Sequence, residues 1–441
     1  MKKRLLMLAL TAAVSFGVMA CGSAEQAADG GSGNDKAGTE EVSKDAIRVV
    51  NGKIEIDSVL KDVAKKYEKE TGQKVAIESL GGGVDISGQI KSYLAADNMP
   101  DIFVIGGEGD YTKNWKGLCE DLSDCKFAKD TDFQFKDEEG KLIGFPYAIE
   151  GYGITYNKDI LEKAGVDPKS LVNYEAFKEA FEKIDAKKKE LGLTAVCSVA
   201  AESGQMYWST GNHMFGYYLS GGVKRDDKTY IDELLKGKLD EPRMDQFAKF
   251  TKLLFDYSDE QTLISGTYDD QLALWANGKA AFITEGNWID PSLPDYNVEF
   301  DCGIAPLAFT KEDMPGILAD CPSWWCVYNK GKHIDECKKF LDYLAESEEG
   351  QKALVIDGGM VSPYKSSKIE PTTPLAVSLK SYVDSDNTYA WDWTKMPEGI
   401  APNSLGLVFE SYAKGDLNEK QFVKMMGTQV EDYISKTKEA E

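Results

Sequence analysis

The chain has 441 residues, which is enough for two or three domains with hydrophobic cores of their own. Its formal net charge of -23 excludes nucleic acid and anionic lipid surfaces as partners of the folded part, because like charges repel. Arginine is scarce, and beyond residue 20 only Arg48, Arg225 and Arg243 occur. Since arginine is the preferred group for binding phosphates and carboxylates, this scarcity favours a neutral or cationic ligand.

Residues 1–20 have the pattern of an export signal. Lys2, Lys3 and Arg4 form a basic head, and an apolar run from Leu5 to Val18 follows that is short for a membrane span. Ala20 then precedes Cys21. The pattern resembles a bacterial lipoprotein signal, in which the cysteine carries the lipid and becomes the new N-terminus. The alternative is an ordinary secretory signal with a coincidental cysteine, and in both cases the protein leaves the cytoplasm.

The segment after Cys21 is predicted to be a flexible tether. Residues 21–45 are rich in small and charged residues and contain little that a core could bury. No later segment is long and apolar enough to span a bilayer. We therefore expect a protein that is held at the outer face of the cell membrane by its lipid alone.

Seven cysteines follow Cys21, an odd number that cannot pair completely within one chain. Export permits disulfides without requiring them. Cys119 with Cys125 and Cys321 with Cys326 are plausible pairs by spacing. A zinc site formed by Cys321, Cys326, His333 and Cys337 is disfavoured, because 324–328 reads as a strand that would hold the first two cysteines apart. We expect no metal and no cofactor.

Strand-like and helix-like patterns alternate from residue 47 onward. Short apolar strands are expected at 47–50, 75–80 and 101–105, and helices at 57–71 and 86–96, the first ended by Gly72. Further helices are expected at about 173–190, 243–257 and 334–345, with a strand at 324–328. This alternation predicts an α/β fold with mainly parallel sheets, and ligands of such sheets bind beyond the carboxyl ends of the strands.

Four segments, in this order, resemble extracellular solute-binding proteins of the maltose-binding type. They are Val63–Gly72; Gly144–Pro146 with Glu150 and Tyr156–Asp159; Trp275–Phe282 with Gly286–Trp288; and Lys338–Leu344 with Gly350. The resemblance implies a two-lobed fold of the type II periplasmic-binding-protein class with the ligand in the cleft between the lobes. It also implies hinge closure on binding and delivery of the ligand to an ATP-driven membrane permease. By analogy, lobe 1 comprises 46–148 plus 307–358, and lobe 2 comprises 149–306 plus 359–438. We expect a monomer.

The aromatic residues point to a sugar as ligand. The C–H faces of a sugar ring stack on aromatic rings, and its hydroxyls pair with carboxylates and amides. Tryptophans occur here beside such polar residues, whereas Trp115 and Trp275 lie in helical patterns typical of core positions. Candidate stacking and neighbouring residues are Tyr152, Trp208, Asn212, Trp288, Trp324, Trp325, Trp391 and Trp393. Strand alternation directs Trp324 and Trp325 to opposite faces, so only one of them is expected in the cleft. Trp391 and Trp393 share a face if their loop is extended.

Four carboxylates are candidates for binding hydroxyls. Glu150 lies in an apolar segment and matches an acid on the crossing strand of the maltose-binding type of protein that this sequence resembles. Glu108, in the Gly-rich loop, matches another acid of that family. Asp85 and Glu55 follow predicted strands but match less clearly.

Two other functions stay open. Paired carboxylates could cleave glycosides, although no nucleophile elbow or zinc-protease motif occurs. An acid-rich site with aromatic walls could also bind a polyamine or another small solute. The abundance of tryptophan and the resemblance favour a neutral oligosaccharide.

Overall fold

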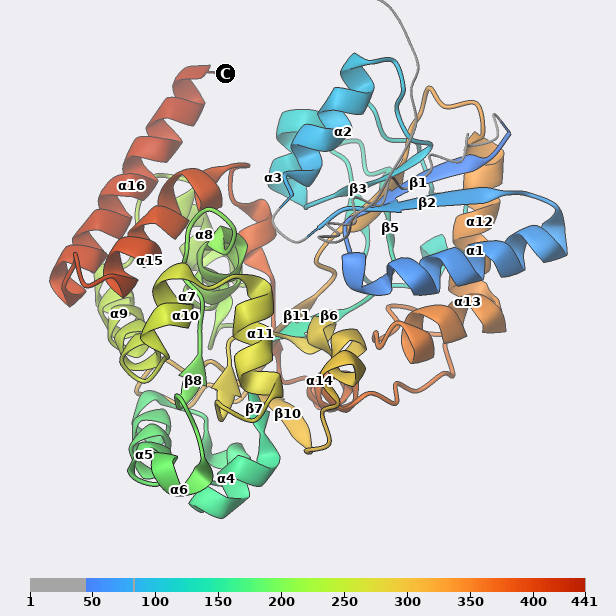
Figure 1. The fold of residues 1–441 in the computed structure, drawn as a ribbon. Coiled ribbons are helices and arrows are strands. Elements are labelled where there is room, and N and C mark those ends of the chain that lie inside the picture. Colours follow the sequence, from blue (N-terminus) through green and yellow to red (C-terminus); the bar gives the residue numbers. More distant parts are fainter. Residues whose placement is uncertain (1–44, 82–83, 441) are drawn as a thin grey trace, which may run out of the picture. The chain divides into compact units, whose positions relative to one another are not determined.

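The computed structural model describes residues 45–81 and 84–440. The predicted signal, Cys21 and nearly all of the predicted tether lie outside these residues. The described chain consists of two α/β lobes and a small sheet of strands that cross between them (Figure 1).

The first lobe is built on a six-stranded sheet in the order β2-β1-β3-β12-β5-β4. The strands are β1 (Ile47–Asn51), β2 (Val75–Ser79), β3 (Ile102–Ile105), β4 (Phe135–Lys136), β5 (Leu142–Pro146) and β12 (Trp324–Val327). The helices are α1 (Asp57–Thr71), α2 (Ile86–Ala95), α3 (Glu108–Asp110), α12 (Ile334–Glu346) and α13 (Glu348–Lys352). Short 3-10 and π segments are η1 (Ile54–Ile56), η2 (Tyr111–Trp115), η3 (Lys126–Lys129) and η7 (Ala353–Asp357).

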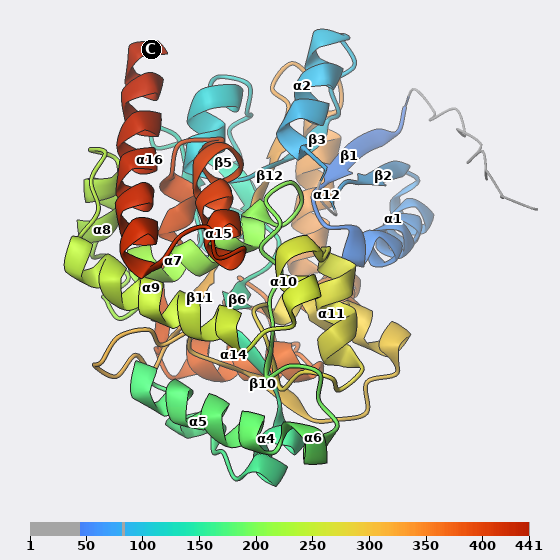
Figure 2. The same ribbon diagram turned by 60° about the vertical axis from the view of Figure 1, so that its left-hand side comes forward.

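The second lobe has a four-stranded sheet in the order β10-β7-β9-β8 and most of the helices. The strands are β7 (Ile154–Asn157), β8 (Cys197–Ser198), β9 (Phe282–Ile283) and β10 (Cys302–Ala305). The helices are α4 (Lys158–Ala164), α5 (Tyr174–Ala186), α6 (Lys188–Leu191), α7 (Phe215–Ser220), α8 (Thr229–Leu234), α9 (Glu241–Asp256), α10 (Glu260–Ser265), α11 (Tyr268–Ala276), α14 (Pro374–Asp384), α15 (Gly406–Ala413) and α16 (Glu419–Ala440). The 3-10 and π segments are η4 (Pro168–Ser170), η5 (Trp208–Met214), η6 (Asn287–Tyr296), η8 (Asp392–Lys395) and η9 (Ala401–Leu405). Figure 2 shows α16 alongside α9, against which it packs.

The two crossing strands, β6 (Glu150–Tyr152) and β11 (Ile317–Asp320), belong to a third sheet in the order β13-β11-β6. Its third strand is β13 (Thr388–Tyr389), from the second lobe. The chain passes through β6 on its way from β5 to β7, and returns through β11 from β10 to β12. Because β6 and β11 pair antiparallel, the two passages are joined by backbone hydrogen bonds at the point where the lobes meet.

The sheets are mixed, and the prediction of mainly parallel sheets is wrong. The first sheet is parallel across β2-β1-β3, but β12 pairs antiparallel with both β3 and β5. In the second sheet only β8 and β9 are parallel. The reason is the return crossing: β12 enters the first sheet from the other lobe and therefore runs against the strands laid down earlier.

The local patterns of the sequence predict the first elements well. The α1 helix covers 57–71 as expected and buries Leu60, Val63, Ala64 and Tyr67 on one face. It ends at Gly72, whose φ of 79° is left-handed and favours glycine. The strands β1, β2, β3 and β12 and the helices α2, α5, α9 and α12 also lie where the patterns predict them, within a few residues.

Two hydrophobic cores underlie the two lobes. One contains buried residues between 47 and 148 and between 321 and 364, and the other contains residues between 149 and 319 and between 361 and 434. The segment 307–319 therefore packs with the second lobe, although the resemblance assigned it to the first. We propose a boundary near residue 320, in the crossing strand β11.

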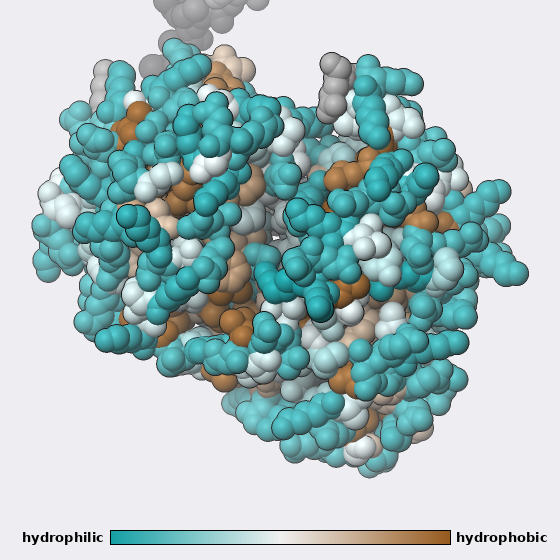
Figure 3. Space-filling view, turned by 180° about the vertical axis from the view of Figure 1, so that it is seen from behind, coloured by the Kyte–Doolittle hydropathy of each residue, from teal (hydrophilic) through white to brown (hydrophobic). Residues whose placement is uncertain are grey.

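On the face of the described chain that Figure 3 shows, most of the surface is hydrophilic and the hydrophobic residues form small patches. Within residues 45–81 and 84–440, no helix combines the length and apolar character that a membrane crossing needs. The seven described cysteines are all free, so neither of the pairs suggested by spacing is present. Cys321 directly follows β11, whereas Cys326 lies within β12, in register with Phe103 of β3.

Candidate functional site

Five aromatic rings from separate parts of the second lobe and the crossing strand meet around one histidine. This aromatic cluster comprises Tyr152, Trp208, His213, Trp288, Trp391 and Trp393. The His213 ring lies 4.9 Å from Trp288, in a stacked arrangement, and 5.4 Å and 5.3 Å from Trp391 and Trp393. Tyr152 and Trp208 lie 5.1 Å and 5.6 Å from the same ring.

Apart from Tyr152, which belongs to the strand β6, these rings lie on irregular segments of the backbone. Trp208 and His213 belong to the π-helix η5, whose widened turns are common at functional sites. Trp288 follows Gly286 at the start of η6, where a Cβ would overlap the carbonyl oxygen of Gly151 and the Trp288 ring. Trp391 directly precedes the 3-10 turn η8, so the condition of an extended loop is not met, yet the rings of Trp391 and Trp393 lie 5.7 Å apart.

Several polar atoms of this cluster are buried and have no hydrogen-bond partner. They are the Tyr152 hydroxyl, His213 Nδ1, and the indole nitrogens of Trp391 and Trp393. Buried polar groups are usually paired, so a group of orphans in one place is typical of a site that a ligand or water completes. Burial, with a smaller contribution from the charge of Lys53, lowers the pKa of His213 to about 3, so the imidazole is neutral at pH 7.

Glu285 is the acid most deeply buried beside these rings. Its Oε2 accepts a hydrogen bond of 2.6 Å from Trp288 Nε1, while its Oε1 has no partner. The pKa of Glu285 is raised to about 8, mainly by burial. The hydrogen bond from Trp288 works against this increase, and the negative charge of Glu55 adds to it. The carboxyl group is therefore mainly protonated at pH 7.

A second polar cluster joins the first lobe to the crossing strand. Lys53 of the first lobe donates to Glu55 Oε1 over 3.1 Å and forms an ion pair with Glu150 at the start of β6. Burial works against the charge of Lys53, but Glu150 and Glu55 together raise its pKa above the ordinary value. Burial raises the pKa of Glu150, and Lys53 opposes that shift. The three side chains form a connected, mostly buried charge network.

The structure therefore brings together most of the predicted site residues. Tyr152, Trp208, Trp288, Trp391 and Trp393 share the aromatic cluster, and Glu150 and Glu55 share Lys53. Asn212 lies half-buried in η5 beside them.

Four other predicted residues lie in different surroundings. Trp325 is fully buried against Phe145 and Tyr147 in the first lobe, and Trp324 stacks on Phe135 at 4.9 Å. As predicted for a strand, the two rings point to opposite faces, but both are packed against aromatic neighbours. Glu108 is exposed on α3, and the exposed Asp85 caps α2 by accepting from the Gly88 amide over 2.9 Å.

Sequence reasoning missed Lys53, His213, Glu285 and Tyr268. Glu285 directly precedes the Gly286–Trp288 segment, and that position was the available signal. Lys53 lies two residues before Glu55, but only the fold brings it to Glu150, which is far away in the sequence. The pKa of Tyr268 is raised mainly by burial, and the charges of Glu285 and Glu55 raise it further, so Tyr268 belongs to the same surroundings.

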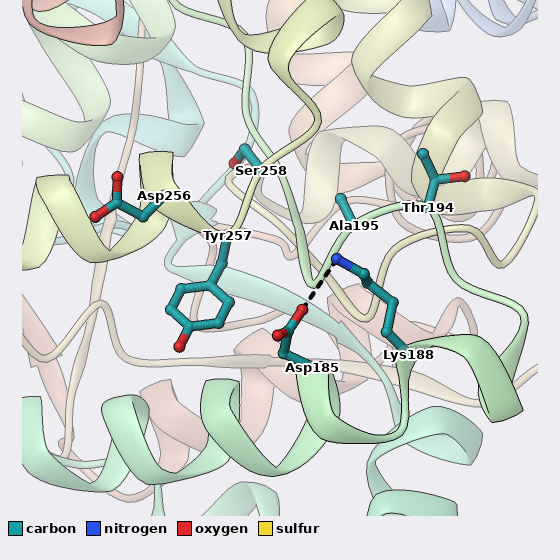
Figure 4. Close-up of a pocket in the computed structure, with 7 residues that line it drawn as sticks. All are labelled: Asp185, Lys188, Thr194, Ala195, Asp256, Tyr257 and Ser258. Atoms are coloured by element: carbon teal, nitrogen blue, oxygen red, sulfur yellow. Dashed lines mark ion pairs between the residues drawn. The ribbon is translucent and has the colours of Figure 1, made fainter. Parts of the chain in front are cut away.

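An open surface cavity of about 430 Å³ lies elsewhere on the second lobe (Figure 4). It is lined by Asp185, Lys188, Thr194, Ala195, Asp256, Tyr257 and Ser258. Asp185 and Lys188 are already paired at 3.0 Å, and none of the predicted site residues lines this cavity. We assign the candidate site to the aromatic cluster, because stacked rings and unpartnered buried polar atoms coincide there.

The sequence matches a family described as bacterial extracellular solute-binding protein over residues 62–376. It is 23% identical over 372 residues to a multiple sugar-binding protein of Streptococcus mutans, covering 79% of this chain and 83% of that protein. It is 26% identical over 375 residues to a diacetylchitobiose binding protein of Streptomyces coelicolor, covering 82% of each.

A solved structure shares the fold. The structure of a sugar transporter protein from Bacillus licheniformis in complex with stachyose aligns with a TM-score of 0.67 at 20% identity, covering 87% of this chain and 99% of that one. The expected two-lobed α/β fold is thereby confirmed. From the family match over most of its folded length, we conclude that the chain belongs to the bacterial extracellular solute-binding proteins.

Proposed function

We propose that this protein captures an extracellular oligosaccharide between its lobes and delivers it to an ATP-driven membrane permease. The observation that carries the proposal is the aromatic cluster with its buried, unpartnered polar atoms. Aromatic faces stack on the C–H faces of sugar rings, and the orphaned hydroxyl, imidazole and indole groups are available to sugar hydroxyls. The names of the relatives, which include a multiple sugar-binding protein, support a saccharide as the ligand class.

Hinge motion supplies access to the site. The cluster is nearly closed to solvent, with Trp288 only 8% exposed, and β6 and β11 form the crossing between the lobes. We infer that small rotations about these strands admit the ligand and then close the lobes over it.

Lipidation of Cys21 is part of the same proposal. Relatives described as solute-binding lipoproteins, such as one from Streptococcus pneumoniae, support it. A lipid followed by a flexible segment keeps a monomeric binder close to its permease and raises its effective concentration there.

A binding screen with two site variants tests the capture of a sugar. Isothermal titration against a panel of oligosaccharides should give at least one saccharide ligand. Replacing Trp288 by Ala should weaken its binding by about 100-fold or more, because a large stacking surface is lost. Glu150→Gln should weaken it by about 10-fold, through the lost charge of the acceptor.

The matched control is Trp288→Phe, which keeps a ring and should retain more affinity than the alanine variant. A panel that binds only spermidine or a peptide would contradict the proposal. The rival reading, a glycoside-acting enzyme, is tested with the same sugars: cleavage products on prolonged incubation would favour it.

A further inference from the structure

One buried carboxylate of the candidate site has no positive charge beside it. Glu285 is fully buried, and its Oε1 has no hydrogen-bond partner. Across the described ranges, no lysine, arginine or histidine forms an ion pair with it, and the nearest charge that shifts its pKa is the negative one of Glu55. Such a group is costly to ionise unless something supplies a compensating charge.

The two neighbouring acids, Glu55 and Glu150, differ from Glu285 because a cation balances their negative charge. Glu150 and Glu55 both pair with Lys53, which approaches them from the first lobe. One cation thus serves two carboxylates and leaves none for the third. His213 cannot supply the charge, because its pKa is lowered to about 3 and the ring is neutral.

The surroundings of Glu285 suit a cation. Trp288 is fixed to its carboxyl group by the 2.6 Å hydrogen bond, and the Tyr152 ring lies parallel to Trp288 at 5.9 Å. The pKa values of Tyr152 and Tyr268 are raised, mainly by burial and secondly by the charge of Glu285. Both phenols are therefore within electrostatic reach of Glu285. Aromatic faces attract cations, and the free Tyr152 hydroxyl is a further acceptor.

We propose that the saccharide taken by this site carries a protonated amino group, and that Glu285 binds the ammonium next to Trp288 and Tyr152. This inference rests on the proposed function and replaces a neutral oligosaccharide by an amine-bearing one. A neutral hydroxyl could pair with the free oxygen, but it brings no positive charge and would leave the carboxyl group in its protonated form. An ammonium supplies the hydrogen-bond donors and the charge together.

The proposal implies a proton balance. Glu285 is mainly protonated in the free protein at pH 7, since burial raises its pKa to about 8. Binding of the ammonium favours the carboxylate, so one proton leaves the carboxyl group for the solvent. The charged and titratable groups coupled to Glu285 are Glu55, Tyr152 and Tyr268, and the Trp288 indole donates a hydrogen bond to it. A neutral sugar releases no proton.

The test uses two ligands of equal length and linkage, a trisaccharide of glucosamine and its fully N-acetylated counterpart. Titration calorimetry at pH 7 should show at least about 10-fold tighter binding of the free amine. Repeating the titration in two buffers of different ionisation enthalpy should reveal proton release with the amine alone. Glu285→Gln, which keeps an acceptor for Trp288, should abolish the preference and the proton release, whereas the exposed control Glu182→Gln should keep both.

Three results would overturn the inference. They are equal or tighter binding of the N-acetylated sugar, an amine preference that survives in Glu285→Gln, and no proton release with the amine. If Glu285→Gln does not fold, the comparison of the two ligands on the unmodified protein still decides. Binding of neutral oligosaccharides alone would refute this inference and leave the proposed function standing, whereas the absence of any saccharide binding would refute both.

Discussion

Lys53 is the residue on which the charge balance between the first lobe and the crossing strand depends. Its side chain is only 12% exposed and contacts Glu55 and Glu150, of which Glu150 is the more deeply buried. A buried ion pair contributes little net stability compared with apolar residues, but removing one partner leaves the other charge uncompensated. Lys53 therefore supplies the positive charge that both acids share.

Replacing Lys53 by Met should lower the free energy of unfolding by about 3 kcal/mol, because Glu150 would remain buried without its partner. Urea denaturation at pH 7 measures the effect. In the double variant Lys53→Met with Glu150→Gln, much of the loss should return, since the buried charge is gone. A single variant as stable as the unmodified protein would show that Glu150 is already neutral.

At the scale of elements, the short helix α3 of the first lobe contacts the turn η8 of the second. Gly109 allows this approach, because a Cβ there would overlap the carbonyl oxygen of Met396. Lys113 adds a hydrogen bond of 3.2 Å to the carbonyl oxygen of Glu398. The contact lies beside the segment that carries Trp391 and Trp393, so closure of the lobes and placement of these rings are linked.

Gly109→Ala should weaken ligand binding by about 10-fold or more, while the two hydrophobic cores keep their stability, because only the approach of the lobes is blocked. Calorimetric titration and a thermal melt separate the two effects. The matched control is Gly427→Ala in α16, where a Cβ meets nothing within 4 Å. That change should leave binding intact and raise stability by about 0.5–1 kcal/mol. Equal affinity in both variants would contradict a role for the α3 contact.

At the scale of the whole molecule, the two separate hydrophobic cores define two lobes. Each lobe buries its own hydrophobic residues, and the crossing strands connect them. Two stable bodies joined by a narrow connection can move as rigid units, which suits a protein that must open, load and close.

Replacing Cys21 by Ala should move the protein from the membrane fraction into the culture medium, because the residue that would carry the lipid is lost. Detergent phase partitioning and immunoblotting of the medium measure this, and the binding affinity of the released protein should be unchanged. Retention in the membrane fraction would contradict lipidation at this residue.

Local sequence determined the elements whose signals are local. The apolar face and glycine stop of α1 and the alternation in β12 each depend on residues a few positions apart, so they could be predicted. Asp85 was expected to bind a ligand, but it caps α2 instead. The family resemblance further indicated Trp288 and Glu150. The π-helix η5 could not be predicted, because its widened turns break the helical period on which the reading relies.

Only the tertiary structure decided which side chains meet. Contacts between distant segments place His213 at the centre of the aromatic cluster and pair Lys53 with Glu150. The same folding buries Glu285 without a cation beside it and leaves its Oε1 without a hydrogen-bond partner. It also placed β12 antiparallel in the first sheet and left the seven cysteines of the described residues unpaired. The physical reason is that burial and charge pairing are properties of the folded surroundings of a side chain, which one sequence alone does not specify.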